Sequence, residues 1–322
     1  MFFPVSGVEV NPLIPPLVAL LVSILTAPAG VSGAFLLLPF QMSFLHYTSP
    51  SVSPTNLIYN IVAIPGGLYR YIKDGRMAWP LTWVVVVGTL PGVFLGSWIR
   101  IAYLPDPKAF KLFVGTVLLY LGVKLVLEFT GKSKNKKVQN KALEQKFKER
   151  VEQLKTETNK KLAAGLPAEA IVKTKSFSLK KIEYDFWGET YSFSTMAIFI
   201  LALVVGLIGG IYGIGGGAII APFCVSILGL PVYTVAGAAL AGTFLTSIAG
   251  VIFYTILAAT SIGASTNVSP DWLLGALFGV GGLLGTYCGA YVQKFLKEKI
   301  VKGIMATLVL FLAFRYIIQF FL

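Results

Sequence analysis

The stretch Gly209–Phe223 constrains this chain most, because six glycines fall within nine residues between long hydrophobic runs. Each glycine weakens a helix by about 1 kcal/mol relative to alanine, so we expect a helix to break here at membrane depth. Broken backbone is tolerated there only where it is buried in protein or lines a cavity. A helix that restarts after the break points free N–H groups and its positive dipole end into that space. The stretch therefore predicts an anion site; the alternative is a glycine-rich helix-crossing surface that binds nothing.

The composition predicts an all-α polytopic membrane protein. The chain has 322 residues, of which 56% are hydrophobic and 13% charged, and several apolar runs approach the roughly 20 residues that span a bilayer. The net charge of +13 does not indicate nucleic acid, because 15 of the 27 Lys and Arg residues lie between Lys132 and Lys181. The basic excess belongs to one hydrophilic connector, whose expected neighbour is an anionic lipid leaflet.

We expect a first membrane repeat at 1–130, a cytoplasmic connector at 131–192 and a second membrane repeat at 193–322. The first apolar stretch, Leu13–Leu45, is interrupted by proline and glycine at Ala27–Gly33, which predicts two short helices joined by a turn. Spans at 54–71, 79–101 and 108–129 follow. The connector predicts an amphipathic helix near 143–162 and a short hairpin within Phe177–Phe193, and contains no catalytic constellation.

The second half repeats the first. A shift of 183 residues places Gly30–Phe40 on Gly213–Phe223 and Asn60 on Thr243. A shift of 193 then matches two glycine ladders: Gly88, Gly92 and Gly96 with Gly281, Gly285 and Gly289. Internal repeats are typical of transporters, and the ladders predict helix-packing faces.

The basic residues favour inverted repeats. If each broken stretch counts as one crossing, the membrane-flanking Lys and Arg residues divide 18 to 7; if each enters and turns back, they divide 22 to 3, with Arg100, Lys108 and Lys111 as the minority. The second count fits the positive-inside rule better. We therefore expect both termini outside and the two broken elements to meet near the midplane from opposite leaflets.

Few ionisable residues lie deep in the predicted spans, so an anion would be held by backbone N–H groups, hydroxyls and amides. The candidates are Asn56, Asn60, Thr243, Ser247 and Ser32. An interhelical hydrogen bond, worth about 0.6 kcal/mol in membranes, is the alternative role for each. Pro39 and Pro222 are expected to kink the returning helices. We expect no catalytic residue, no metal site and no cofactor.

Gly33 and Gly216 are repeat partners where both halves keep a bare backbone. Two physical reasons could apply: a positive φ, or a substrate that approaches the backbone too closely for a side chain. We expect the second, because the same turn supplies the N–H donors for the anion.

The motif Gly213-Ile-Gly-Gly-Gly-(x)4-Pro222, followed by Ala238-Ala-Leu-Ala-Gly-Thr243 in a duplicated unit, resembles the TauE/SafE sulfite exporter family of permeases. The resemblance implies transport of small sulfur-containing anions such as sulfite, sulfoacetate or thiosulfate. It also implies functional roles for Gly213, Gly215, Gly216, Gly217 and Pro222, and for Gly30, Gly33 and Pro39. The first half departs from the pattern, because Ser32 and Ala34 replace two glycines.

The favoured interpretation is an alternating-access transporter in the cell membrane, not an enzyme. The alternatives are an anion channel with a backbone-lined filter and a transporter of non-sulfur organic anions. A third class is a membrane enzyme or thiol-relay protein that uses Cys224. The competing role for Cys224 is that of a small buried apolar residue that only fills space. The expected partners are a small anion and the lipid bilayer, without nucleic acid, and a homo-oligomer stays open.

Overall fold

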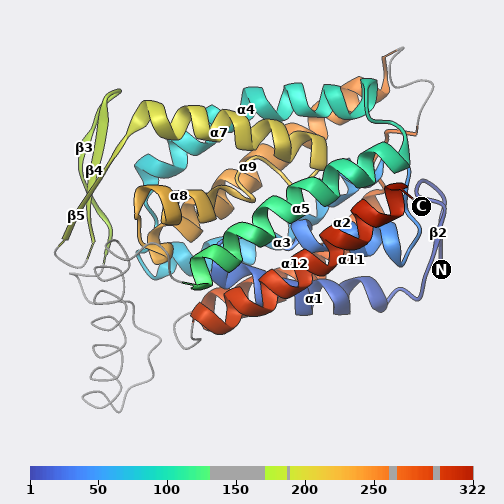
Figure 1. The fold of residues 1–322 in the computed structure, drawn as a ribbon, viewed down its shortest axis with the longest axis horizontal. Coiled ribbons are helices and arrows are strands. Elements are labelled where there is room, and N and C mark those ends of the chain that lie inside the picture. Colours follow the sequence, from blue (N-terminus) through green and yellow to red (C-terminus); the bar gives the residue numbers. More distant parts are fainter. Residues whose placement is uncertain (131–170, 187–188, 261–266, 293–297, 322) are drawn as a thin grey trace.

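A computed structural model of the chain describes residues 1–130, 171–186, 189–260, 267–292 and 298–321. The amphipathic helix expected near 143–162 lies outside the described residues. The described part is mainly helical (Figure 1), and five of its helices are long and apolar enough to cross a membrane. The prediction of an all-α polytopic membrane protein is confirmed, apart from two small β-sheets.

The first half follows the predicted order closely. Its helices are α1 (Ile14–Thr26), a 3-10 turn η1 (Ala27–Ala29), α2 (Ala34–Ser43), α3 (Val52–Lys73), α4 (Trp79–Ala102) and α5 (Pro107–Thr130). The apolar stretch breaks where proline and glycine interrupt it, because Gly30 adopts a left-handed φ of 68° that ends the helical turn.

The second half has the same order: α7 (Thr195–Tyr212), α8 (Ile220–Leu228), α9 (Val232–Ala258), α11 (Trp272–Val292) and α12 (Glu298–Phe321). Ser194 caps the start of α7 by accepting a hydrogen bond from the Ala197 N–H. The helix ends at Gly213, whose φ of 78° is left-handed. Both broken elements are therefore helix–turn–helix units.

The glycine ladders are packing faces, as predicted. A Cβ on Gly92 of α4 would lie 2.3 Å from the Leu203 carbonyl oxygen of α7, and one on Gly285 of α11 would lie 2.5 Å from the Leu20 carbonyl oxygen of α1. Such close approach of two backbones is possible only without side chains. Each ladder thus joins a helix of one half to a helix of the other.

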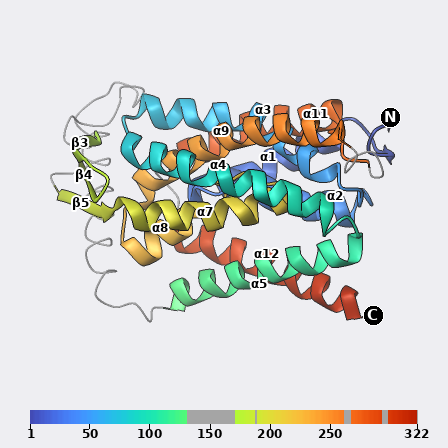
Figure 2. The ribbon, with the colours of Figure 1, turned by 90° about the horizontal axis from the view of Figure 1, so that it is seen from above.

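Two pairs of equivalent helices, α3 with α9 and α5 with α12, run antiparallel. Along α3, Leu57, Asn60 and Gly67 meet Gly250, Ser247 and Leu240 of α9, so residue numbers rise on one helix as they fall on the other. In the same way, Gly115 and Gly122 of α5 meet Tyr316 and Leu310 of α12. In both views the two termini lie at one end of the molecule, here called the terminal end, and the strands β3–β5 lie at the other, the sheet end (Figures 1 and 2).

Six of the helices, including α3 and α9, form two groups of three parallel members. In the first group α3 lies along α11, with Thr55 beside Asp271 and Ala63 beside Thr286, and α1 follows the α11 glycine ladder. In the second group α4 lies along both α7 and α9. Each group combines helices from both halves, and the groups meet where α3 crosses α9.

The sheet at the sheet end contains β3 (Lys173–Phe177), β4 (Lys181–Phe186) and β5 (Glu189–Ser194), all antiparallel. The pairing of β4 with β5 confirms the hairpin expected within Phe177–Phe193. Alternate residues of β4 are buried, and the Tyr184 hydroxyl lies 3.0 Å from the Thr234 hydroxyl of α9. The sheet therefore packs its apolar face on the helices.

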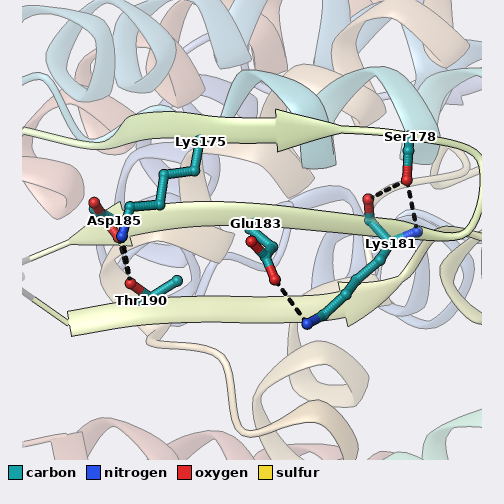
Figure 3. Close-up of polar contacts among 6 residues, drawn as sticks. All are labelled: Lys175, Ser178, Lys181, Glu183, Asp185 and Thr190. Atoms are coloured by element: carbon teal, nitrogen blue, oxygen red, sulfur yellow. Dashed lines mark hydrogen bonds and ion pairs between the residues drawn. The ribbon is translucent and has the colours of Figure 1, made fainter.

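The outer face of this sheet carries polar pairs (Figure 3). The Thr190 hydroxyl donates to Asp185 Oδ1 at 2.7 Å, and the Lys175 ammonium lies 3.1 Å from the same oxygen. The hydrogen bond from Thr190, helped by Lys175, lowers the pKa of Asp185. Asp185 therefore stays ionised at neutral pH and fixes β3 against β4 and β5.

Candidate functional site

Each broken element packs on a long helix of the other half through a left-handed glycine. A Cβ on Gly30 would lie 2.7 Å from the Cα of Ala236, and one on Gly213 would lie 2.5 Å from the Cα of Ser53. Ser53 and Ala236 are themselves separated by 183 residues, so each turn rests on the equivalent point of the other half. At each of these two positions glycine is required for two reasons: the positive φ and the close approach of another backbone.

Each turn is also held by a tyrosine, and the two tyrosines are repeat partners. The Tyr71 hydroxyl donates to the Ala27 carbonyl at 3.3 Å, and its repeat partner Tyr254 donates to the Gly210 carbonyl at 3.0 Å. Both carbonyls lie three residues before a left-handed glycine. The phenols therefore satisfy backbone acceptors that a broken helix leaves open.

Asn60 joins the two turns. Its Oδ1 accepts a hydrogen bond from the Ser32 hydroxyl of the first turn. Its Nδ2 donates to the Ile214 carbonyl of the second turn at 2.9 Å and to Ser247 Oγ of α9 at 3.1 Å. All three side chains are buried. Three predicted site residues, Ser32, Asn60 and Ser247, thus come together at the second turn.

Asn56 makes a similar junction one turn earlier on α3. Its Nδ2 donates to the carbonyls of Ala34 and Gly213, both at 3.0 Å, and its Oδ1 accepts from Gln41 at 3.2 Å. Because both amides already have partners on other helices, Asn56 and Asn60 have the interhelical role in this conformation. They fasten the turns together and present no free amide.

The backbone, by contrast, keeps open donors. Among the described residues, the N–H groups of Ser32, Gly33, Gly215 and Gly217 make no hydrogen bond, whereas Gly216 N–H donates to Thr246 Oγ1 at 2.9 Å. Ser32 and Gly215 are repeat partners, so an open N–H recurs at the same place in both turns. Backbone donors at a turn are suited to an anion.

Thr243 lines the second turn without bonding to it. Its Oγ1 donates to the Ala239 carbonyl of its own helix at 2.8 Å. A Cβ on Gly217 would lie 2.9 Å from this Oγ1, and one on Gly215 would lie 2.8 Å from Ser247 Oγ. The predicted glycines and hydroxyls of the second half therefore form one wall.

Neither Gly33 nor Gly216 has a positive φ, so this reason for a bare backbone is wrong. A Cβ on Gly216 would lie 2.4 Å from the Cβ of Thr89, and one on Gly33 would lie 2.2 Å from the Tyr59 hydroxyl oxygen. At Gly216 the obstacle is the β-carbon of a helical residue, so close packing alone excludes a Cβ there. At Gly33 the obstacle is the end of the Tyr59 side chain, which must shift to admit a Cβ.

The two prolines differ. Pro222 is the third residue of α8, where a missing N–H breaks no helical hydrogen bond, so the expected kink is wrong there. Pro39 lies inside α2 and leaves the carbonyl four residues earlier, on Phe35, without its helical donor. The Tyr212 hydroxyl donates to this carbonyl at 3.0 Å.

Sequence reasoning missed Arg100. It counted this residue among the basic charges at helix ends, but the side chain is fully buried. Ser53 and Ser97, both buried, were not singled out either. The spacing of Ser97 and Arg100 places them on one helical face, but only the fold brings α3 and Tyr254 beside them.

Cys224 is buried and Cys288 is exposed, and both are free thiols. The burial of Cys224 agrees with a packing role. Within the described ranges, no cluster of His, Cys, Asp and Glu is suited to a metal ion.

The family model described as "Sulfite exporter TauE/SafE" matches residues 16–316. No curated protein and no solved structure matches the chain significantly. The match includes both broken elements and every helix between them, so the duplicated glycine turns lie inside it. This chain is a multi-pass membrane protein that belongs to the TauE/SafE sulfite exporter family of transporters.

Proposed function

We propose that this protein transports small sulfur-containing anions, such as sulfite, sulfoacetate or thiosulfate, across the cell membrane by alternating access. The observation that carries the proposal is the junction at Asn60, where the turns of both halves meet in buried, polar surroundings. Transporter sites typically form where two broken helices meet near the bilayer midplane.

We further propose that the halves are inverted repeats, with the sheet end in the cytoplasm. The antiparallel pairs α3/α9 and α5/α12 support this arrangement. Charge supports it too, because Arg70 and Arg76 lie beside the sheet end, whereas Lys108 and Lys111 begin α5 at the terminal end (Figure 1). Short cytoplasmic loops carry the larger share of Lys and Arg.

In the proposed site, the open N–H groups of Ser32, Gly33, Gly215 and Gly217 hold the anion. A small oxyanion has several acceptor oxygens, which suits donors from two facing turns. The hydroxyls of Thr243 and Ser247 then set the width and polarity of the second-half wall. Binding requires Asn60 to release at least one contact, so the anion and the Asn60 bridge compete.

The two helix groups support the proposal of alternating access. The junction lies between α3 of one group and α9 of the other, so rocking of one group against the other opens it to either end in turn. The α5/α12 pair belongs to neither group and contacts the short helices α2 and α8, through Tyr316 at Pro39 and Tyr120 at Phe223.

Flux assays of the purified protein in liposomes test the transport proposal. We expect sulfite uptake that saturates and shows counterflow, and competition by thiosulfate or sulfoacetate that exceeds competition by acetate. Uptake that rises linearly without counterflow would indicate a channel, and preference for acetate would indicate a transporter of other organic anions.

A matched pair of threonine variants tests the location. Thr243 and Thr255 of α9 both donate to the carbonyl four residues earlier, but only Thr243 faces the second turn. We expect Thr243→Val to change the KM for sulfite several-fold and Thr255→Val to leave it unchanged. Equal KM values for both variants and the wild type would remove the site from this wall.

Cysteine labelling tests the topology. In a background carrying Cys224→Ala and Cys288→Ser, single cysteines at Phe2 and Leu179 are accessible, since these side chains are 60% and 87% exposed. We expect a membrane-impermeant maleimide to label Phe2→Cys from outside the cell and Leu179→Cys only in inverted vesicles. Labelling of both from the same face would contradict the inverted arrangement.

A further inference from the structure

A cation without a counter-charge lies near the second turn, toward the terminal end. Arg100 is fully buried close to the end of α4. Its Nη1 donates to the Leu104 carbonyl, and its Cζ lies 3.7 Å from the centre of the Phe110 ring. No ion pair among the described residues includes Arg100, and its Nε and Nη2 have no hydrogen-bond partner there. A buried charge left uncompensated is costly.

The hydroxyls of Ser97 and Ser53, which have no hydrogen-bond partner among the described residues, lie near Arg100. Ser97 precedes Arg100 by about one helical turn, so the two share a face of α4. Gly96, next to Ser97, packs on Gly210, and Ser53 packs on Gly213, so both serines lie near the Tyr254 phenol. The phenol itself donates to Gly210, and neither serine hydroxyl has a well-formed hydrogen bond within the described residues.

This cluster is continuous with the junction of the two turns. Ser53 lies directly against the Gly213 backbone. Ser53, Asn56 and Asn60 follow one another on one face of α3, and the two asparagines bond to the second turn. A polar stripe therefore leads from Arg100 to the proposed transport site.

We propose that Arg100, Ser97 and Ser53 form an anion-binding site that receives a small oxyanion, such as sulfite or a sulfonate, from the terminal end. A guanidinium presents parallel N–H donors that match two oxygens of one oxyanion, and the serine hydroxyls donate to the remaining oxygen. Arg100 is buried in this conformation, so the anion enters when the terminal end opens. Its role in transport rests on the proposed function, whereas the binding itself does not. The competing account is structural: Arg100 only bonds Leu104 and offsets the carbonyl end of α7.

Thermal unfolding of the full-length protein in detergent separates these accounts. We compare sulfite with chloride at equal ionic strength, using Arg100→Met, Arg100→Lys and the control Lys108→Met, which removes an exposed cation at the same end. We expect sulfite to raise the Tm of the wild type and of Lys108→Met but not of Arg100→Met, whose affinity should fall by at least about 30-fold. Arg100→Lys should retain an intermediate affinity, because an ammonium cannot form the fork.

The chloride samples give the second readout. Removing an uncompensated buried charge should leave the Tm of Arg100→Met at or above that of the wild type. A lower Tm in chloride together with an undiminished sulfite shift would establish the structural account. If Arg100→Met fails to fold, Ser97→Ala and Ser53→Ala replace it: weaker sulfite binding at an unchanged Tm in chloride supports the site, and undiminished binding in both overturns it.

Two further comparisons fix the ligand and its role. A lipid headgroup phosphate has similar chemistry, so a Tm shift with phosphatidylglycerol and none with sulfite would overturn the assignment to a small anion. In liposomes, sulfite binding through Arg100 without any flux in the wild type would overturn the transport proposal and leave the site. Flux with an unchanged KM in Arg100→Met would overturn the site and leave transport.

Discussion

At the scale of single residues, Gly216 shows how a bare backbone can be required by the protein itself. A Cβ at this position meets the Thr89 Cβ at 2.4 Å, and α4 cannot retreat easily because its glycine ladder packs tightly on α7. The restriction therefore arises from packing and does not require a ligand.

We predict that Gly216→Ala destabilises the protein by about 1–3 kcal/mol, the usual range for overpacking. Adding Thr89→Gly should restore most of this loss, less the cost of about 1 kcal/mol for a new glycine in a helix. Thermal unfolding in detergent measures both effects. A Gly216→Ala protein that unfolds like the wild type but has lost transport would indicate instead that substrate approaches this backbone.

The polar residues show what sequence can and cannot supply at this scale. Repeat alignment identified Asn60 and Thr243 because they occupy equivalent positions. It could not show that Asn60 is saturated by Ser32, Ser247 and Ile214, since these contacts join segments far apart in the chain. Arg100 was missed for the same reason: burial at a helix end depends on which helices cover it.

At the scale of elements, the broken helices were the most predictable feature. Apolar length, glycine and proline fix where a helix must stop, and the observed α1 and α2 flank the predicted interruption. The side chains that bond the free backbone carbonyls at each break come from distant parts of the chain. Tyr212 reaches the carbonyl freed by Pro39 from the other half of the chain, and no spacing in the sequence encodes that contact.

The two turn-holding tyrosines give a prediction at this scale. Among the described residues, the Gly210 carbonyl accepts only from Tyr254, whereas the Ala27 carbonyl also accepts from the Gly30 N–H. Tyr254→Phe should therefore cost about 1–3 kcal/mol, the penalty for an unsatisfied buried acceptor, and Tyr71→Phe about 0.5–1.5 kcal/mol. Thermal unfolding of both variants is the measurement. Equal losses, or a larger loss for Tyr71→Phe, would show that the two turns are not held as described.

At the scale of the whole molecule, neither half has a complete interior of its own. The α11 ladder requires α1, and the α4 ladder requires α7, so the tightest helix contacts cross between halves. The internal repeat predicted two similar units, but their interlocking could not be inferred, because either repeat orientation is compatible with the same pattern of apolar spans.

We predict that fragments 1–150 and 151–322 copurify when coexpressed, because each supplies the partner for the other's glycine ladder. Expressed separately, each fragment should aggregate or be degraded. Size-exclusion chromatography in detergent distinguishes these outcomes, with the intact chain as the reference. A monodisperse, helical first fragment on its own would contradict the dependence on α11.

The glycine-ladder contacts between the two halves also determine when each helix can reach its final packing during synthesis. The chain is made from its N-terminus, so α1 enters the membrane long before α11, the helix that covers it. At about 5–20 residues per second, the ribosome needs on the order of 10 to 50 s to pass from α1 to the end of α11. Throughout this interval the backbone of α1 at Pro16 and Leu20 lacks the α11 glycines that cover it in the finished protein. A newly made first half must therefore be sheltered by the insertion machinery or by a temporary pairing until the last quarter of the chain arrives.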